Sequence, residues 1–206
     1  MVEEILTPEL VKKLMAFEGK IRGMDLKIDG EFILKKEGKE NFEKLKEKLI
    51  KIGIPNEYQY DKIKSLDFYP GGLKAISLLA IKQVLGYDDE KIQEIGMIAS
   101  KSSLIVRIFI KYFLPISDFF FKKGPRIWDK YWTVGKLTPL DLNEKEKSAL
   151  VRIEGLDLHP VYCTYLKGYF ATLTKMVTGG SNVICQETKC SFRGDKVHEF
   201  LLKWQH

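Results

Sequence analysis

Cysteine and histidine are scarce in this chain, with three residues of each, and no long apolar run is uninterrupted. The odd number of cysteines argues against a framework of paired disulfides, which leaves metal binding or simple burial as their roles. The most apolar stretch, residues 104–121, contains Arg107, Lys111, Pro115 and Asp118. These interruptions make it too short to cross a bilayer, so we expect a buried helix or two there and no membrane span.

Several functional signatures are also missing from the sequence. It has no Gly-x-Gly-x-x-Gly, no phosphate-binding loop and no evident nucleophile with a histidine and an acid, so an enzyme is the weaker hypothesis. The chain starts with Met1-Val2-Glu3-Glu4-Ile5, which is acidic where a signal peptide carries positive charge. We therefore expect a cytoplasmic protein.

The charges are numerous but dispersed. The 34 basic residues are offset by 28 acidic ones, which leaves a net charge of +6. In residues 37–51 the two signs alternate, which is typical of a solvated helix face. Because no basic cluster with interleaved stacking aromatics is present, nucleic-acid binding by this chain alone is disfavoured.

The length of 206 residues and the apolar content of 45% predict one main domain, residues 38–206, preceded by an extension, residues 1–37. In the extension, Thr7-Pro8 predicts a helix start. Within residues 24–36, Asp29-Gly30 lies between two short extended runs, which predicts a type I′ β-hairpin.

The rest of the chain predicts helices first and strands later. Helical periodicity covers residues 40–52, 73–85, 104–114 and a segment from Asp88 or Asp89 to about residue 100. We then expect strands at 132–142 and 149–156, a helix from Pro160 to about 177, and strands at 183–187 and 196–204. The predicted fold class is α+β, with an N-terminal helical layer packed on an antiparallel sheet.

The residues able to bind a metal gather near the C-terminus, where all cysteines and histidines lie within the last fifty positions. Glu187-x-x-Cys190 and His198 flank a predicted turn, and Cys163 lies in the first turn of the preceding helix, where a thiolate is favoured. Together they could form a closed tetrahedral site. The alternative is that these are ordinary buried, turn and strand residues, since free cysteine is commonly buried.

A resemblance favours the metal site. Residues 155–163, 168–170, 183–190 and 194–200, with Glu187-x-x-Cys190 followed by Gly194-Asp195, resemble the 4-vinyl reductase domain family. This resemblance implies an α+β fold shared with trafficking-complex subunits and distantly related to haem-based nitric-oxide sensors. It also implies a structural zinc bound by Cys163, Glu187, Cys190 and His198, the last replacing the usual cysteine.

If one of these four ligands is wrong, His159 or Cys185 is the expected substitute. The resemblance further implies an apolar ligand cavity between the helical layer and the sheet. The expected lining residues are the aromatics Phe109, Phe113, Trp128, Tyr131 and Trp132, each of which could equally be an ordinary core residue. Arg107 or Lys111 could meet an anionic head group or extend to solvent.

The sequence thus predicts a zinc-stabilised domain that binds or senses a small hydrophobic molecule, which could be aromatic, a hydrocarbon or tetrapyrrole-like. One alternative is an enzyme or accessory factor in tetrapyrrole metabolism, and another is a scaffold subunit whose cavity is filled. We also expect a symmetric homodimer, the commonest closed assembly.

Overall fold

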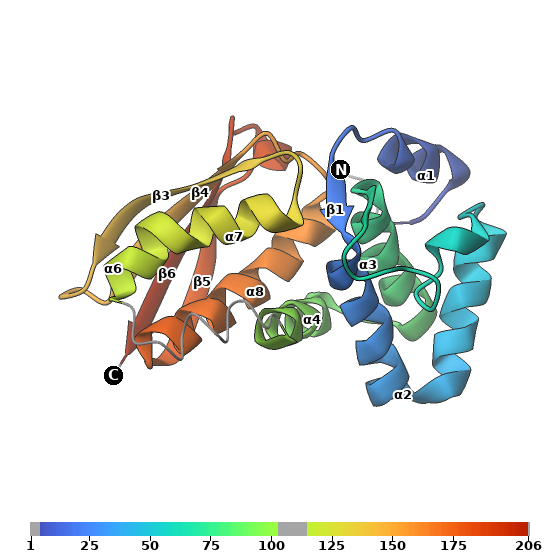
Figure 1. Ribbon diagram of the computed structural model, residues 1–206, viewed down its shortest axis with the longest axis horizontal. Helices are drawn as coiled ribbons and strands as arrows, with labels where there is room; N and C mark the ends of the chain where they lie inside the picture. The colour runs from blue at the N-terminus through green and yellow to red at the C-terminus, as the bar shows by residue number, and fades with distance from the viewer. Residues whose placement is uncertain (1–4, 103–114, 206) are drawn as a thin grey trace.

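The computed structural model describes residues 5–102 and 115–205 (Figure 1). One side of the molecule is helical and the other holds a four-stranded sheet, with α4 beside α8 between them. The helices are α1 (Pro8–Met15), α2 (Gly23–Lys51), α3 (Gly72–Leu85), α4 (Asp89–Ser102), α6 (Ile116–Asp118), α7 (Gly124–Tyr131) and α8 (Pro160–Thr178), with short helical turns η1 (Asn56–Tyr58), η2 (Phe119–Lys123) and η3 (Ser191–Arg193). The strands are β1 (Lys20–Arg22), β2 (Phe68–Pro70), β3 (Lys136–Asn143), β4 (Ser148–Glu154), β5 (Ser181–Lys189) and β6 (His198–Gln205).

The large sheet is antiparallel throughout, with strand order β3-β4-β6-β5. The side chains of β4 alternate, so that Ala149, Val151 and Ile153 are buried on one face. On β6, Phe200 and Leu202 are buried in the same way. Because alternation at a period of two places these residues on one side of the sheet, that side packs against helices α7 and α8 (Figure 1). The predicted α+β class with an antiparallel sheet is confirmed.

The start of the chain folds partly as predicted. Thr7 caps α1, since its Oγ1 accepts a hydrogen bond of 3.2 Å from the backbone N–H of Leu10. The predicted hairpin at residues 24–36 is wrong, because this segment is the first part of α2. The Asp29-Gly30 pair is a packing feature instead: Asp29 is fully buried, and a Cβ on Gly30 would lie 2.6 Å from the Cβ of Tyr60.

Helix α2 continues across the predicted domain boundary. It is kinked at Gly38, whose φ of 82° and ψ of 174° are not helical. Glycine adopts such angles without the steric cost that a side chain imposes. The segment predicted as a separate helix at 40–52 is the second arm of α2, and the division into residues 1–37 and 38–206 stays a prediction.

The central helices are in close contact. A Cβ added to Gly96 of α4 would lie 2.1 Å from the carbonyl oxygen of Tyr165, and one added to Gly168 of α8 would lie 1.9 Å from that of Gln93. The two backbones therefore approach so closely that only glycine fits at these positions. This contact holds α8 between the helical side and the sheet.

The predicted helix at 104–114 lies outside the described residues. Among the helices in the described part of the chain, none has both the length and the apolar character needed to span a bilayer.

Candidate functional site

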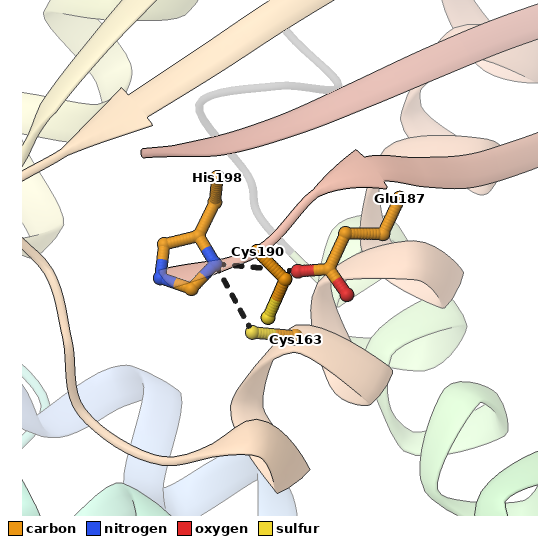
Figure 2. Close-up of side chains that lie close together, drawn as sticks. All are labelled: Cys163, Glu187, Cys190 and His198. Atoms are coloured by element: carbon orange, nitrogen blue, oxygen red, sulfur yellow. Dashed lines mark hydrogen bonds and ion pairs between the residues drawn. The ribbon is translucent and has the colours of Figure 1, made fainter. Parts of the chain in front are cut away.

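Four potential metal ligands converge at one end of α8 (Figure 2). Cys163 lies in the first turn of α8, Glu187 near the end of β5, Cys190 immediately before η3, and His198 at the first position of β6. Each offers one ligand atom, and these atoms all lie within 4.8 Å of one another. The structure therefore brings together the four residues that the sequence singled out.

We call these four residues the thiol cluster, and His198 contacts two of its other members. Its Nδ1 lies 3.5 Å from the Cys163 Sγ and 3.2 Å from the Glu187 Oε1. Its Nε2 lies 2.9 Å from the Ser191 Oγ and 3.4 Å from the Asp157 Oδ1. One ring nitrogen thus faces the other ligands while the second is held by outer residues, the arrangement that orients a histidine ligand.

Further contacts shape the chain around the cluster. The backbone N–H of Cys190 donates a hydrogen bond of 2.8 Å to the Asp195 Oδ2 and so fixes the turn between β5 and β6. An Nη2 of Arg193 lies 3.5 Å from the Glu187 Oε2. Cys163, Cys190 and His198 are each less than 7% exposed. The cluster is therefore assembled and shielded by the fold.

The pKa values of the thiols and of the carboxylate in the cluster are shifted in opposite directions. Burial raises the pKa of the Cys163 and Cys190 thiols, and the negative charge of Glu187 adds to the effect. Burial also acts to raise the pKa of Glu187, but hydrogen bonds with His198, Cys190 and Cys163 outweigh it and hold that pKa below its usual value. Without a metal the thiols are therefore protonated at neutral pH, and a metal ion would displace their protons.

The two substitute ligands lie outside the thiol cluster. The His159 Nδ1 accepts a hydrogen bond of 3.1 Å from the backbone N–H of Val161, which caps α8. Cys185 pairs with Leu202 in the middle of β5. A solvent-facing cleft of about 520 Å³ adjoins the cluster and is lined by His159, Cys163, Glu187 and Cys190, among others.

A second feature is an aromatic cavity between α7, α8 and the start of β3. The predicted residues Trp128, Tyr131 and Trp132 line it, whereas Phe109 and Phe113 lie outside the described residues, as do Arg107 and Lys111. Its volume is about 50 Å³. A second cavity of about 40 Å³ lies deeper against the sheet, and both are lined by Phe119, Gly124, Leu137, Phe170 and Leu173.

The sequence interpretation missed part of this lining. Tyr162, Tyr165 and Tyr169 recur every three or four residues along α8, a spacing that places them on one helix face, and all three line the aromatic cavity. That periodicity was visible in the sequence. Asp25 of α2 also lines the cavity, but its segment was predicted to be a hairpin.

The aromatic rings are mostly held in place by one another. Trp128 and Trp132 are stacked with ring centroids 6.4 Å apart, and Tyr162 and Tyr165 are stacked at 5.4 Å. The Trp132 Nε1 donates a hydrogen bond of 2.9 Å to the Tyr162 hydroxyl. The cavity walls are therefore mainly aromatic faces with few polar groups.

No protein-family model matches the chain, and no curated protein matches it. Solved structures do resemble it, and several of them are H-NOX proteins. One, from S. oneidensis in the Fe(II) ligation state, has a TM-score of 0.67 at 11% identity and covers 90% of this chain and 97% of its own. An unliganded Fe(II) H-NOX mutant from K. algicida has a TM-score of 0.63 at 9% identity, covering 90% and 97%. A third, from a study of heme distortion in the H-NOX family, has a TM-score of 0.61 at 14% identity, covering 90% and 96%.

These likenesses show the fold and correct two expectations. The assignment to the 4-vinyl reductase family is wrong, because the similar structures are H-NOX proteins and no family model matches. Its motifs lay within about fifty residues, whereas the H-NOX likeness covers 90% of the chain. The expected structural zinc is also wrong, because the similar structures are named for Fe(II) and heme. A mixed thiol, imidazole and carboxylate set does not specify one metal, which is why the ligand pattern could not name the cofactor.

Proposed function

We propose that this protein is a sensory or binding module for a compact molecule with an apolar body, which occupies the aromatic cavity. The observation that carries the proposal is the pair of adjoining cavities between α7, α8 and the sheet. A cavity of 10 to 15 Å³ holds about one water molecule, so these cavities are several times that size.

The chemistry of the walls indicates the kind of ligand. The lining of the deeper cavity consists mainly of aliphatic and aromatic side chains, including Phe170, Leu202 and Trp204. Apolar walls favour apolar molecules over water, as an engineered enclosed cavity of about 150 Å³ binds benzene. Rotation of Phe119 or Phe170, which line both cavities, would join them. Joined, the two cavities would offer about 90 Å³, which is less than that engineered cavity, so a ligand the size of one aromatic ring enters only if these walls also move outward.

Haem does not fit this cavity, although the similar structures are named for it. The described lining holds no histidine, cysteine or methionine, residues that commonly ligate haem iron. His198 belongs to the thiol cluster, His159 lines the cleft beside it, and the remaining histidine, His206, lies outside the described residues. A macrocycle is also far larger than benzene, for which about 150 Å³ suffices.

Tyrosine offers no better axial ligand. The Tyr162 hydroxyl accepts a hydrogen bond from Trp132, and the Tyr165 hydroxyl donates one of 2.6 Å to the Asp25 Oδ1. Burial raises the pKa of Tyr162, Tyr165 and Tyr169, which opposes the tyrosinate form. The size argument applies equally to a tetrapyrrole substrate, so the cavity favours a small ligand over the tetrapyrrole alternative.

The test is titration of the purified protein with benzene or toluene, followed by calorimetry and by the melting temperature. Saturable binding is expected, and it should be lost in Leu173→Phe, which fills the wall common to both cavities. The matched control is Leu34→Phe, at a site on α2 that is 45% exposed. If toluene does not bind the wild-type protein at any concentration up to its solubility, a scaffold with a filled core is the better interpretation.

We also propose that the thiol cluster binds a divalent transition-metal ion. What supports this is the convergence of two thiols, an imidazole and a carboxylate within 4.8 Å. A metal here would join α8, β5 and β6 and so contribute free energy to folding. Elemental analysis identifies the ion, and Co²⁺ gives a thiolate charge-transfer absorption if the sulfurs ligate it. Metal bound equally by wild type and by Cys163→Ser would refute the assignment.

Self-association and location remain proposals. We propose a symmetric dimer on the general ground that two-fold homodimers are the commonest closed assembly, and a cytoplasmic location. Light scattering that reports a mass of 23.8 kDa at all concentrations would exclude the dimer.

A further inference from the structure

We propose that the ligand of the aromatic cavity is a small organic cation, an aromatic or alkyl ammonium whose charge pairs with the carboxylate of Asp25. This inference rests on the proposed function, because it names the chemistry of the molecule that enters the same cavity. It is drawn from a buried network of charged residues that borders the cavity.

The network joins α2, α3 and α8. The Lys74 Nζ lies 2.7 Å from the Asp29 Oδ1 and 3.5 Å from the Asp25 Oδ2. The Ser77 hydroxyl donates a hydrogen bond of 2.7 Å to the Asp29 Oδ2, and the Tyr165 hydroxyl donates one of 2.6 Å to the Asp25 Oδ1. Lys74 and Asp29 are fully buried and Asp25 is 6% exposed, so water screens these charges very little.

The charges in this network do not balance. It holds two carboxylates, Asp25 and Asp29, and one ammonium, Lys74. With both carboxylates ionised the sum is one excess negative charge in a buried site, and a buried charge without a counter-charge is costly. Lys74 is closer to Asp29, so Asp25 is the less compensated of the two. Asp25 is also the one that lines the cavity.

The cavity walls suit a cation. In the described lining Asp25 is the only acidic side chain, and no lysine, arginine or histidine is present. The remaining walls are largely the rings of Trp128, Trp132, Tyr131 and the α8 tyrosines. Aromatic faces attract ammonium groups, most strongly where water is excluded. The network already shows this contact, since the Lys74 Nζ lies 4.0 Å from the ring centroid of Tyr165.

A carboxylate beside apolar walls thus discriminates between ligands of equal shape. A neutral ring such as toluene gains only apolar contact. A protonated amine on the same ring gains a charge-assisted hydrogen bond to Asp25 and removes the excess charge. Hydrogen bonds to charged groups contribute about 1.5 to 3 kcal/mol, which corresponds to about tenfold or more in affinity.

The experiment compares benzylamine, benzyl alcohol and toluene by calorimetry at pH 7.5, where benzylamine is protonated. Benzylamine is expected to bind about tenfold or more tightly than either neutral ring. In Asp25→Asn this preference should disappear, while toluene affinity stays within about twofold. Glu31→Gln, which removes an exposed carboxylate from the same helix, should leave all three affinities unchanged.

The outcomes separate the two proposals. If toluene binds as tightly as benzylamine, or benzyl alcohol binds more tightly, the cation inference is overturned and the apolar-ligand proposal stands. If none of the three binds, both fail. Should Asp25→Asn fold poorly, Asp25→Glu provides a second measurement, because it keeps the charge and should keep a preference for the amine.

Discussion

Removal of the buried ammonium of Lys74 should destabilise the protein in a manner that depends on pH. Lys74→Met keeps the length and apolar stem of the side chain but leaves Asp25 and Asp29 without their only ammonium partner in the described network. Breaking a buried ion pair by removing one member costs about 3 to 5 kcal/mol. The groups that face this site are Asp25 and Asp29 from α2, Tyr165 from α8, and Ser77 and Tyr60 behind Asp29.

The pH dependence follows from Asp29. Burial raises its pKa from 3.8 to about 6, with the charge of Lys74 acting to lower it and that of Asp25 to raise it. Between these pH values the folded state binds more protons than the unfolded state, so this carboxyl makes the protein less stable as pH rises through the window. The difference between these two pKa values corresponds to a loss of about 3 kcal/mol in unfolding free energy above pH 6.

In Lys74→Met the pKa of Asp29 should rise further, because the positive charge that lowers it is gone. The loss of unfolding free energy should therefore be about 3 to 5 kcal/mol at pH 7.5 and at least about 1 kcal/mol smaller at pH 5, where Asp29 is protonated. Urea denaturation of wild type and variant at both pH values measures this. Lys39→Met, at an exposed site on α2, is the control. A loss that is equal at the two pH values would refute this account of the network.

Three further predictions concern packing, metal and cavity. Gly168→Ala should lower stability by about 1 to 3 kcal/mol, because its Cβ would lie 1.9 Å from the Gln93 carbonyl oxygen; an unchanged melting temperature would contradict the close contact. Cys190→Ser should lower both the bound metal and the melting temperature, whereas Cys185→Ser, outside the thiol cluster, should change neither; equal metal content in the two variants would remove Cys190 from the site. Phe119→Ala should join the two cavities and admit a bicyclic ring such as indole, which calorimetry detects; binding no better than in wild type would show that Phe119 does not separate them.

The C-terminal part of the chain was predictable because its signals are local. Pro160 at the first helical position and Gly179, with φ of 68°, after the last one bound α8. Alternation of apolar residues identifies β4 and β6 without reference to the rest of the fold. The convergence of Glu187, Cys190 and His198 was also predictable, since residues on either side of one strand turn have to meet.

The first half of α2 was not predictable in this way. Asp29-Gly30 is a strong turn signal in an isolated peptide. In the folded protein, Asp29 pairs with Lys74 from a helix 45 positions later, and Gly30 allows Tyr60 to approach. Tertiary contacts therefore override the local preference, and they are not visible in a window of a few residues.

By itself, then, the sequence determined the four strands of the large sheet, the start and end of α8 and the residue types of the thiol cluster, because short-range periodicity, capping and turn chemistry specify them. The tertiary structure alone decided that the first half of α2 is helical, that Asp25 borders a cavity lined by the α8 tyrosines, and that the described lining of this cavity offers haem no histidine ligand. These features depend on side chains brought together from distant segments, such as Tyr165 and Asp25, which are 140 positions apart. Such pairings arise only when the helices pack.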